Sequence, residues 1–454
     1  MKKTIKLAVV AALALGTTSA FATNGDNLIG YGAKSRGMAG TSIGLSHGAE
    51  SALSNPALIN DNEVTFGGTV FMPNVDFKNT AVTPNGTSGT KVADSASDLS
   101  VIPEVALSVK VNDNFSWGIG MYGVAGMGVD YRDDSAVFQN PSDESTYAGT
   151  ESGTNNMLTN LQLMRFAVPL AYHMDNFSVA VSPILQYGSL DIAYNAGQYY
   201  TDGLGNKHNT MTGRGVSQDF GFGYNIGLAY EVAGLTVGAV YTSSIDMTYD
   251  HQISDATKQF GLNGGQGLSD HLEQPAEIGV GASYKIGKNT IALDFKQIKW
   301  SDAKGYKDFK WEDQNVIALG YEYATQGWSL RAGYNHATNP IKEQKAASMA
   351  TDYDGAVINY FNAVGFPATT ESHFALGGTY NISKTFGVDL AYTYAPKVTK
   401  TLDTSALTQA QVYAGAIAGG ATQAQAGQAA AASSSEAKVT HSQQAVTVAM
   451  TIKF

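Results

Sequence analysis

The sequence predicts an all-β protein, a 14-stranded antiparallel transmembrane β-barrel with an N-terminal plug inside its lumen. Three observations lead to this fold class: large apolar residues alternate with small or polar ones, short turns alternate with long connections, and the chain begins with an export signal. The composition agrees, because 50 glycines, 24 tyrosines and only 15% charged residues suit an outer-membrane barrel better than a helical soluble protein.

Residues 1–22 have the features of a cleaved signal peptide. Three lysines precede an apolar stretch from Leu7 to Leu15, and Ala20-Phe21-Ala22 has the small-x-small pattern that signal peptidase requires. The apolar stretch is too short to span a bilayer, and no later stretch reaches the roughly 20 apolar residues of a transmembrane helix. We therefore expect export, followed by cleavage after Ala22.

The segment from Phe220 to Tyr230 gives the clearest strand signal. Every even position in it is large and apolar, and every odd position is glycine, asparagine or alanine. Because successive strand residues point to opposite faces, one face of this strand is apolar and the other is small or polar. A soluble β-sandwich shows the same alternation, so alternation alone does not place the chain in lipid.

The turns provide the discriminating evidence. Six short turns alternate with seven long polar connections, which divides residues 61–454 into 14 strands. The short turns lie at 112–114, 175–176, 233–234, 287–289, 325–327 and 383–384, and the long connections run roughly over 78–97, 131–156, 196–216, 250–272, 301–310, 337–370 and 397–440. An even number of strands with short periplasmic turns and long outside loops is typical of bacterial outer-membrane barrels, whereas a Greek-key sandwich does not sort its loops by length.

The last strand has a pattern typical of outer-membrane barrels. Its alternating apolar residues are Val446, Val448, Met450, Ile452 and Phe454, and they resemble the signal through which the barrel assembly machinery recognises its substrates. Aromatic residues gather near the short turns, as in the girdle at a membrane interface. We therefore expect a protein of the outer membrane, surrounded by its lipid and lipopolysaccharide.

Two segments do not fit the strand pattern. Residues 23–60 are rich in glycine, serine and alanine and cannot build a core of their own, so we expect them to plug the barrel formed by residues 61–454. Residues 404–436 are dominated by alanine, glutamine, glycine and serine, and we expect a low-complexity outside loop with a short helix over Leu407 to Ile417. A role as a surface adhesin is a minor alternative for the 397–440 loop.

The plug contains Arg36-Gly-Met-Ala-Gly40 and ends in Asn55-Pro56-Ala57, shortly before the first strand. These motifs, at this spacing and before 14 strands, resemble the N-terminal hatch of the FadL/TodX family, which carries long-chain fatty acids and aromatic hydrocarbons across the outer membrane. The resemblance covers the whole mature chain and implies a monomer that transports a hydrophobic small molecule. The chain departs from the family at His47-Gly48, where acidic residues are usual; the nearest acid is Glu50.

The resemblance also implies an inward kink in the third strand, which opens a hole in the barrel wall. The matching strand runs from Phe115 to Asp130. Its second half contains Gly123, Val124, Ala125, Gly126 and Gly128. Three glycines in six residues weaken a strand and permit a bulge or bend, so we expect the lateral opening here. The alternative is that these glycines allow close packing against the hatch.

Apolar side chains in loops that should be polar are candidates for a ligand-binding groove. They are Val357, Ile358, Tyr360, Phe361, Val364 and Phe366 in the 337–370 connection, with Met157, Leu158 and Leu161 where the fourth strand begins. The alternative is a loop that packs on itself. On the strength of the resemblance, Leu28, Ile29 and Tyr31 are candidates for capping a lumen pocket from inside.

A carboxylate ligand also requires a cation. Strand parity places Arg165, Arg331 and Lys285 in the lumen, and we favour Arg165 because it follows an apolar stretch. The alternative is an internal ion pair between Arg165 and a lumen acid such as Glu277 or Asp389.

These features favour a passive transporter without a cofactor. An acyl chain in water costs about 0.8 kcal/mol per exposed methylene, so a greasy groove, a lumen pocket and a side opening would keep the chain out of water. The alternative is a general diffusion porin for small polar solutes, which would favour an open and charged constriction over a plug.

Other function classes fit the sequence poorly. Gly44-Leu-Ser46-His-Gly48 matches the nucleophile elbow of lipases, but that motif requires a strand, turn and helix in an α/β sheet, so we do not expect an enzyme. The eight histidines show no metal-binding spacing, and there is no cysteine. A net charge of −11 argues against nucleic acid as a partner.

Overall fold

The structure is a computed structural model that describes residues 24–454 apart from 83, 87, 133–137, 140–152 and 202–206. The expected signal peptide and its cleavage after Ala22 lie outside the described residues, as does most of the expected 131–156 connection. Among the described residues, no helix is long and apolar enough to cross a membrane.

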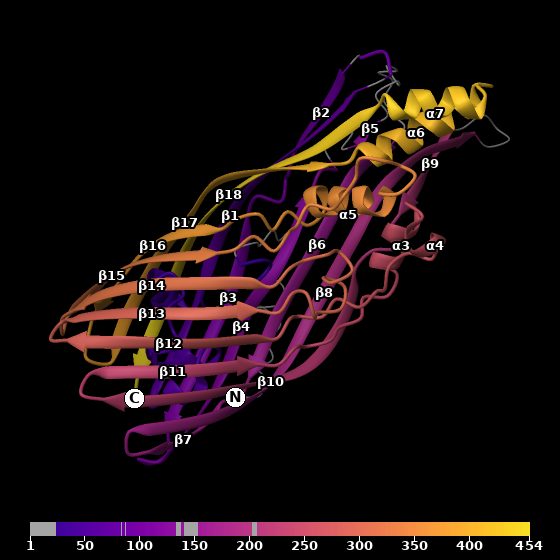
Figure 1. Cartoon of the computed structure of the whole chain (residues 1–454). Helices are drawn as coiled ribbons and strands as arrows, with labels where there is room; N and C mark the ends of the chain where they lie inside the picture. Colours follow the sequence, from indigo (N-terminus) through magenta and orange to yellow (C-terminus); the bar gives the residue numbers. More distant parts are fainter. Residues whose placement is uncertain (1–23, 83, 87, 133–137, 140–152, 202–206) are drawn as a thin grey trace.

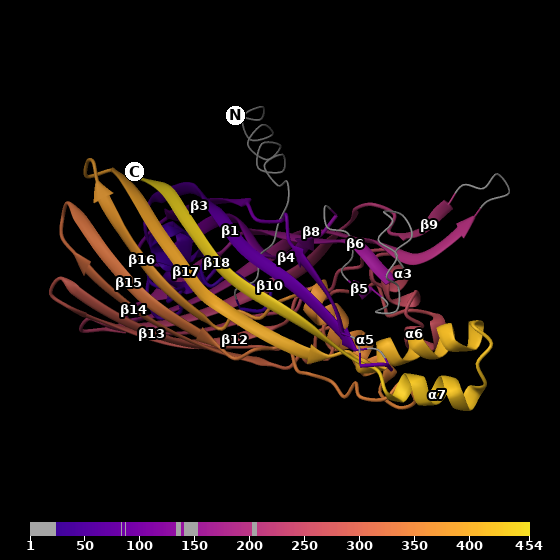
Figure 2. The same ribbon diagram turned by 90° about the horizontal axis from the view of Figure 1, so that it is seen from above.

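The strands form one closed antiparallel sheet, seen as a ring of tilted strands in Figures 1 and 2. β1 (Glu63–Val82) closes the ring because it pairs with both β3 (Ser100–Lys110) and β18 (Ser434–Lys453). The remaining barrel strands are β4 (Phe115–Asp130), β6 (Gly153–Ala167), β8 (Phe177–Thr201), β10 (Ser217–Val232), β11 (Leu235–Thr242), β12 (Glu277–Ile286), β13 (Asn289–Ile298), β14 (Gln314–Ala324), β15 (Trp328–Ala337), β16 (Ser372–Asn381) and β17 (Phe386–Asp403).

Four further strands of the described residues extend or continue these, so the barrel has 14 strands, as the sequence predicts. They are β2 (Ser88–Asp94), β5 (Phe138–Gln139), β7 (Leu170–Met174) and β9 (Lys207–Thr212). The six short turns lie where the sequence places them and gather at one end of the barrel, whereas the larger helices gather at the other (Figure 1).

The wall is interrupted in the fourth expected strand, 157–174. β6 ends at Ala167 and β7 begins at Leu170, because Pro169 has no N–H to donate to a ladder. The wall nevertheless continues, since the Val168 amide donates to the Pro183 carbonyl at 3.2 Å.

The long connections hold more regular structure than the sequence predicts. α3 (Ile253–Lys258) and α4 (Leu262–Gly265) lie in the 250–272 connection, and α5 (Tyr353–Val364) lies in the 337–370 connection. The last connection holds two helices, α6 (Ser405–Ala418) and α7 (Gln423–Ala431), so the prediction of a single short helix in an irregular loop is wrong. Alanine and glutamine favour helix, and Thr422 and Gln425 begin α7 with a capping box, a signal that the low-complexity composition hides.

The outer face of the barrel is apolar. In β10 the even residues are exposed and the odd residues turn inward, and Phe222 alone is 78% exposed. The exposed aromatic side chains near the short turns include Tyr172, Phe177, Tyr230, Tyr284, Tyr321, Trp328 and Tyr380. A surface of this kind suits the hydrocarbon of a bilayer with an aromatic girdle at its boundary.

Residues 24–60, here called the N-terminal segment, lie inside the barrel. They include α2 (Ala33–Gly37) and the 3₁₀ turns η1 (Gly48–Ala52) and η2 (Pro56–Leu58). The segment bonds to opposite parts of the wall: Arg36 bonds to β18, Ser42 to β13 and Asn55 to β10. Glycines on the inner face make room for it, because a β-carbon would collide with it at Gly227, Gly238, Gly320, Gly333 and Gly377.

Buried charges tie the same segment to β1. Lys34 Nζ lies 3.0 Å from Glu63 Oε1, and the Lys34 amide donates to Glu50 at 3.1 Å. Burial raises the pKa of Glu50 to about 8, although the Lys34 ammonium opposes this. His47 bonds through Nε2 to the Thr41 carbonyl at 2.7 Å, and burial lowers its pKa to about 3. The buried ring of His47 is therefore neutral.

Candidate functional site

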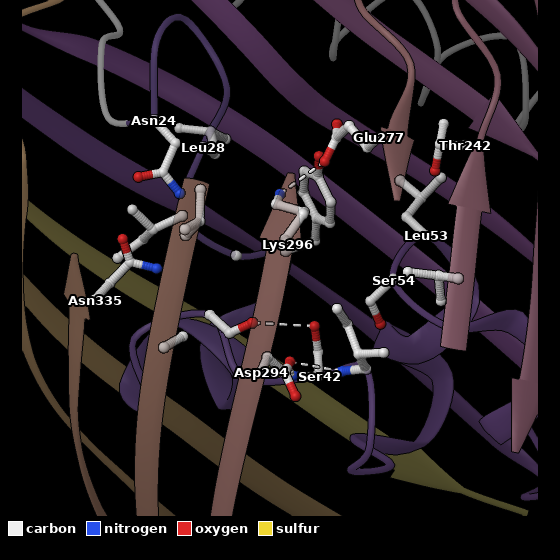
Figure 3. Close-up of a pocket in the computed structure, with 18 of the residues that line it drawn as sticks. Asn24, Leu28, Ser42, Leu53, Ser54, Thr242, Glu277, Asp294, Lys296 and Asn335 are labelled. Atoms are coloured by element: carbon white, nitrogen blue, oxygen red, sulfur yellow. Dashed lines mark hydrogen bonds and ion pairs between the residues drawn. The ribbon is translucent and has the colours of Figure 1, made fainter. Parts of the chain in front are cut away.

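A cavity lies between the N-terminal segment and the inner faces of β6 and β11–β15 (Figure 3), and we call it the lumen cavity. Its volume is about 60 Å³, so a ligand larger than a few water molecules has to displace lining side chains. Its apolar lining comes from Leu28, Ile29, Tyr31, Ile43, Leu53, Val240 and Val316, and its charged lining comes from Arg165, Glu277, Asp294 and Lys296. Polar side chains complete the wall, so the cavity combines an apolar part with a polar part that holds two cations and two acids.

Arg165 and Lys296 are the cations of the lumen cavity. Arg165 is 3% exposed; its Nε donates to Gln186 at 2.9 Å, and its Nη2 has no hydrogen-bond partner among the described residues. Lys296 Nζ lies 2.7 Å from Glu277 Oε2, and Figure 3 shows these two side chains meeting at the edge of the cavity. A buried guanidinium nitrogen without an acceptor is costly, so the geometry favours a ligand that offers an oxygen to it.

Asp294 fixes the N-terminal segment at the opposite side of the cavity. Its Oδ2 accepts the amides of Ser42 and Ile43 at 2.6 and 2.8 Å. Figure 3 shows the bond from Ser42 beside the cavity. Asp294 therefore shapes the cavity and holds its lining in place.

The second half of β4 leaves the barrel wall. Its pairing with β3 ends at Glu104 and Tyr122, and its register with β6 shifts between Gly123 and Ala125. Beyond Gly123 every residue to the end of the strand is buried, so this half of the strand no longer has a lipid face. Residues 97–103 and 123–129 are therefore not paired with each other as neighbouring strands, and we call this unpaired part of the wall the β3–β4 window.

The window is bounded at both ends. At its outer end, the Ala96 amide donates to the Asp130 carbonyl at 2.8 Å. A β-carbon on Gly123 would lie 2.5 Å from the Ile102 side chain, so Ile102 fills the lower part. Leu99 and Val101 are exposed beside it, which makes the outer rim apolar.

The first described residues of the N-terminal segment close the window from inside. The Leu28 amide donates to the Val124 carbonyl at 3.0 Å, and the Gly126 amide donates to the Asp26 carbonyl at 3.1 Å. Asn27 forms an isolated antiparallel bridge with Ala125 between these bonds. In the second half of β4, the backbone thus pairs with residues 26–28 on the side where the first half pairs with β3.

A group of aromatic rings, here called the aromatic cluster, fills the loop end of the lumen. Phe361 of α5 lies 5.1 Å from Phe260 and 6.2 Å from Phe309 between ring centroids, and Phe366 lies 5.7 Å from Phe309. The Gly365 carbonyl after α5 accepts the Thr159 hydroxyl of β6 at 2.6 Å. These side chains pack on one another and on the barrel, which corresponds to the alternative of a loop that packs on itself.

A second aromatic group joins that cluster to the N-terminal segment. The rings of Trp300, Tyr306 and Trp311 meet in tilted and edge-to-face contacts, with centroids 4.6 to 5.1 Å apart. Trp311 Nε1 donates to Asn362 of α5 at 2.9 Å, and the Tyr306 hydroxyl donates to Asp26. Contacts therefore run without a break from α5 to the residues that close the β3–β4 window.

Asp26 is fully buried at this junction. The amide of Gln274 donates to its Oδ2 at 2.9 Å, beside the Tyr306 hydroxyl. Burial raises the pKa of Asp26 to about 6, and the two hydrogen bonds limit the rise.

The structure brings some of the sequence-predicted site residues together and separates others. Arg165, Leu28, Ile29 and Tyr31 line one cavity. Met157 and Leu161 face inward towards the aromatic cluster with Phe361 and Phe366, whereas Leu158 alternates with them and lies half-buried on the other face of β6.

The other expected lumen cations do not reach the cavity. Arg331 is paired with Glu322 at 2.7 Å and lies 3.9 Å from Asp389. Lys285 is exposed beside the turn at 287–289, so strand parity alone misplaces it.

Asn55, Pro56 and Ala57 end the N-terminal segment in η2. Asn55 Nδ2 donates to the carbonyls of Ile43 and Leu228 at 2.8 and 3.0 Å, and its Oδ1 accepts the Ala57 amide at 3.1 Å. This motif anchors the segment to itself and to β10, and through Ile43 it holds one residue of the cavity wall in place, although Asn55, Pro56 and Ala57 do not line the lumen cavity themselves.

Several site residues were not foreseen. Lys296 had a usable signal, because Ile291, Leu293 and Phe295 mark the outward face of β13 and leave Lys296 inside. Phe260, Tyr306 and Phe309 lie in connections without periodicity, and Trp300 and Trp311 flank the 301–310 connection, so no strand pattern marked any of them as site residues.

A second cavity opens at the turn end of the barrel. It has a volume of about 680 Å³ and lies between η2 and the turns after β3, β7 and β10, and its wall includes Asp113, His173, Asp175 and Glu231. A polar and acidic mouth of this kind offers nothing to a hydrophobic solute.

Comparisons with known proteins identify relatives along most of the chain. A family model described as outer membrane protein transport protein (OMPP1/FadL/TodX) matches residues 8–442. Outer membrane protein P1 of Haemophilus influenzae is 22% identical over 323 residues, which cover 64% of this chain and 65% of that protein, just under two thirds of its length. The long-chain fatty acid transport protein of Escherichia coli (strain K12) is 22% identical over 442 residues, which cover 86% and 91% of the two chains.

Solved structures share the fold. A FadL homologue of Pseudomonas aeruginosa has a TM-score of 0.63 at 17% identity, and the Pseudomonas putida toluene transporter TodX has 0.60 at 18%; each covers 95% of this chain and 100% of the other. At these sequence identities the structural similarity establishes the fold alone, and the assignment to a family rests on the match to the family model. This chain is an outer membrane protein and belongs to the OMPP1/FadL/TodX family of outer membrane transport proteins.

Proposed function

We propose that this chain moves long-chain fatty acids passively across the outer membrane, through the loop end, the lumen cavity and the β3–β4 window. The observation that supports this most is the unsatisfied Nη2 of Arg165 in a cavity whose wall also carries aliphatic side chains. A fatty acid supplies both parts that such a site accepts, a carboxylate oxygen for the guanidinium and methylenes for the aliphatic wall.

The aromatic cluster is our proposed entrance. Its rings and α5 belong to the long connections, at the end of the barrel that faces the outside in this fold class. An acyl chain that displaces these rings from one another exchanges apolar contacts for apolar contacts. Entry therefore requires loop movement and no exposure of the chain to water.

The β3–β4 window is our proposed exit. Its outer rim is apolar, and the lumen cavity touches the same residues that close it, because Leu28 belongs to both. The turn end of the barrel is polar, so direct release into the periplasm would place the acyl chain in water. Release into the bilayer avoids that cost and needs no ATP.

Several further assignments belong to this proposal. Residues 1–22 are the signal peptide, residues 23–60 are the hatch and residues 61–454 are the barrel, which acts as a monomer in contact with lipopolysaccharide. Phe454 closes the strand that the barrel assembly machinery would recognise. Ser46 has no catalytic role in this proposal; its hydroxyl donates to the Leu58 carbonyl at 2.9 Å, and esterase assays of Ser46→Ala test that.

Aromatic hydrocarbons are the second candidate ligands, because TodX, a toluene transporter, shares the fold and rings surround the proposed entrance. A porin for polar solutes is the weaker alternative, since the N-terminal segment fills the lumen. Planar-bilayer conductance separates the porin from both transporters: large, steady open channels would exclude our proposal.

The decisive test measures binding to the detergent-purified protein. Oleate, oleyl alcohol and toluene compete with a fluorescent fatty acid, first on the unchanged chain and then on Arg165→Gln. We expect oleate to lose about tenfold to a hundredfold in affinity, the range for one charged hydrogen bond, and oleyl alcohol to change little. Arg331→Gln is the control, because Arg331 is buried without lining the cavity.

Uptake provides the cellular test. The chain is expressed in Escherichia coli that lacks its own long-chain fatty acid transport protein, and growth on oleate is followed. Growth that depends on the added gene supports the proposal. Binding of toluene without binding of oleate would replace fatty acids by aromatic hydrocarbons as the ligand.

A further inference from the structure

We propose that Asn335, His373 and Gln443 form a second ligand-binding subsite, here called the neutral polar strip, which binds the hydroxyl group of a hydroxylated long-chain fatty acid. The inference rests on the proposed function, because the carboxylate of the same ligand would lie at Arg165 in the lumen cavity. It follows from a row of buried polar atoms that have no hydrogen-bond partner among the described residues.

The three residues of the neutral polar strip lie in one row on the inner face of the barrel. Asn335 of β15 pairs in register with His373 of β16. The next two ladders place Ala395 of β17 between His373 and Gln443 of β18. Ala395 carries only a methyl group, so the side chains on either side of it reach each other, and Gln443 acts on the His373 ring.

The strip adjoins the lumen cavity at Asn335. This residue lines the cavity, and Figure 3 shows its amide group at the cavity wall. At the other end of the strip, Gln443 Nε2 donates to the hydroxyl of Thr370, which follows α5, at 3.4 Å. The strip therefore extends the wall of the lumen cavity towards the residues that follow α5.

The side chains of the strip are only 1% to 3% exposed. Their amide nitrogens are used: Asn335 Nδ2 donates to the Ala39 carbonyl at 3.2 Å, and Gln443 Nε2 donates to His441 Nε2 at 3.1 Å. The two amide oxygens and both ring nitrogens of His373 have no hydrogen-bond partner in the part of the chain that the structure describes. A buried polar atom without a partner is costly, so this concentration of them indicates a missing partner.

The unpartnered atoms define the chemistry of that partner. His373 is buried with no acid bonded to it among the described residues, so its neutral ring is favoured, with one N–H and one lone pair. Amide oxygens only accept, so the strip presents one donor and three acceptors. If Gln443 turned to accept the His373 N–H, the other ring nitrogen and the Asn335 oxygen would still lack a donor. A hydroxyl group supplies one, whereas a carboxylate would meet mainly acceptors.

A metal ion is a poorer occupant of the strip. The described residues contain no group of three histidine, cysteine or acidic side chains that could hold one. A divalent cation buried without a carboxylate beside it is costly. Water offers the same donors and acceptors as a hydroxyl group, so the test has to separate these two.

The strip and Arg165 meet at one cavity, because Asn335 and Arg165 both line it. A plain fatty acid satisfies the guanidinium and leaves the strip without a donor. A fatty acid with a hydroxyl group on its chain satisfies both, and its methylenes lie against the aliphatic side chains between them. The lumen cavity should therefore prefer the hydroxylated acid.

The test compares stearate, 3-hydroxystearate and 12-hydroxystearate as competitors of a fluorescent fatty acid on the detergent-purified protein. The two hydroxy acids distinguish a hydroxyl group near the carboxylate from one in the middle of the chain. We expect one of them to bind about tenfold more tightly than stearate, as one or two neutral hydrogen bonds allow. That affinity ratio should fall about tenfold in His373→Phe, which removes both ring nitrogens.

His173→Phe is the matched control. His173 is another buried histidine of the inner barrel face, but it lies at the turn end and its two ring nitrogens lie 2.8 and 3.2 Å from the hydroxyls of Ser178 and Ser116. The affinity ratio should stay the same in this variant. Partitioning of the ligands into detergent is the same for all variants, so it cancels when their ratios are compared.

The methyl ether of the preferred hydroxy acid tests the need for a donor in the unchanged chain. It keeps the oxygen and loses the O–H, so we expect it to bind no more tightly than stearate. Equal binding of the ether and the hydroxy acid would overturn the inference. A preference for the hydroxy acid that disappears on addition of EDTA would assign the strip to a metal ion and overturn it as well.

The outcomes separate this inference from the proposed function. If stearate and both hydroxy acids bind equally well, the strip holds water only, and the inference falls while the proposed function stands. If the unchanged chain binds none of the three, the proposed function fails first. If His373→Phe does not fold, the methyl ether decides alone, because that measurement needs no variant.

Discussion

Gly377 of β16 lies against Gly37 of the N-terminal segment so closely that a β-carbon on Gly377 would be 2.8 Å from the Gly37 Cα. The reverse distance, from a β-carbon on Gly37 to the Gly377 Cα, is 3.0 Å. Real β-carbons do not approach backbone so closely, so the absence of both side chains is what lets α2 seat on the wall. Glycines such as these two therefore allow the N-terminal segment to pack closely against the barrel wall.

Gly377→Ala should loosen the N-terminal segment. The added methyl group meets the Gly37 backbone and the Leu390 carbonyl, neither of which is the end of a flexible side chain, so we expect a destabilisation of about 1–3 kcal/mol. Thermal unfolding of the detergent-solubilised protein, read by circular dichroism, measures the effect. Gly327→Ala is the control, since a β-carbon there meets nothing within 4 Å. Equal melting temperatures for the two variants would contradict the close fit.

Asn55→Ala should free the end of the N-terminal segment. The substitution leaves the carbonyls of Ile43 and Leu228 without their amide donor and removes the acceptor for the Ala57 amide. Each lost buried hydrogen bond costs about 1 kcal/mol or more, so proteolysis within 24–60 should become faster by an order of magnitude or so. Ser54→Ala is the control, because among the residues that the structure describes the Ser54 hydroxyl makes a single long bond, 3.4 Å, to the Ser51 carbonyl. Equal cleavage rates would show that the motif does not anchor the segment.

Closing the β3–β4 window with a disulfide should stop transport. Asn27 and Ala125 form an antiparallel bridge, whose partners have Cα atoms about 4.5–5.5 Å apart, close enough for a disulfide once both are changed to cysteine. The chain has no cysteine of its own, so this bond can form in only one way. We expect oleate uptake to stop in the oxidised double variant and to return on reduction, while oleate binding persists. Normal uptake by the oxidised protein would place the exit elsewhere.

The sequence predicts the barrel well because each strand carries its own evidence. The alternation from Phe220 to Tyr230 and the short turns are local, and the structure keeps them. Arg165 was placed in the lumen by the same parity. The same alternation did not place Lys285 correctly, because it predicts only which face of the strand a residue lies on. It does not predict how far along the barrel the residue lies, and Lys285 lies at the exposed turn end.

The rest of the site depends on contacts between segments distant in sequence. Asp26 meets Tyr306 across 280 positions, and Asn27 meets Glu277 across 250. Periodicity and turn signals describe neighbouring residues along the chain, so they cannot predict a contact between two residues this far apart in the sequence. The same holds for Trp300, Tyr306 and Trp311, which lie at the ends of and within the 301–310 connection, a stretch without strand periodicity.

Asp26 should make the closure of the window depend on pH. Its pKa is raised to about 6 where it is buried, against 3.8 when the segment is released into water, so the protonated form favours the closed window. Protonated Asp26 stabilises the closed window by up to about 3 kcal/mol, since each pKa unit is worth about 1.36 kcal/mol. This stabilisation is complete below pH 3.8, and it is lost as the pH rises through 6. Hydrogen-exchange protection of the Leu28 and Gly126 amides, corrected for intrinsic rates, should therefore fall between pH 4 and pH 7. Asp26→Asn keeps the shape without the titration and should give a flat profile; the same fall in that variant would assign the pH dependence to another group.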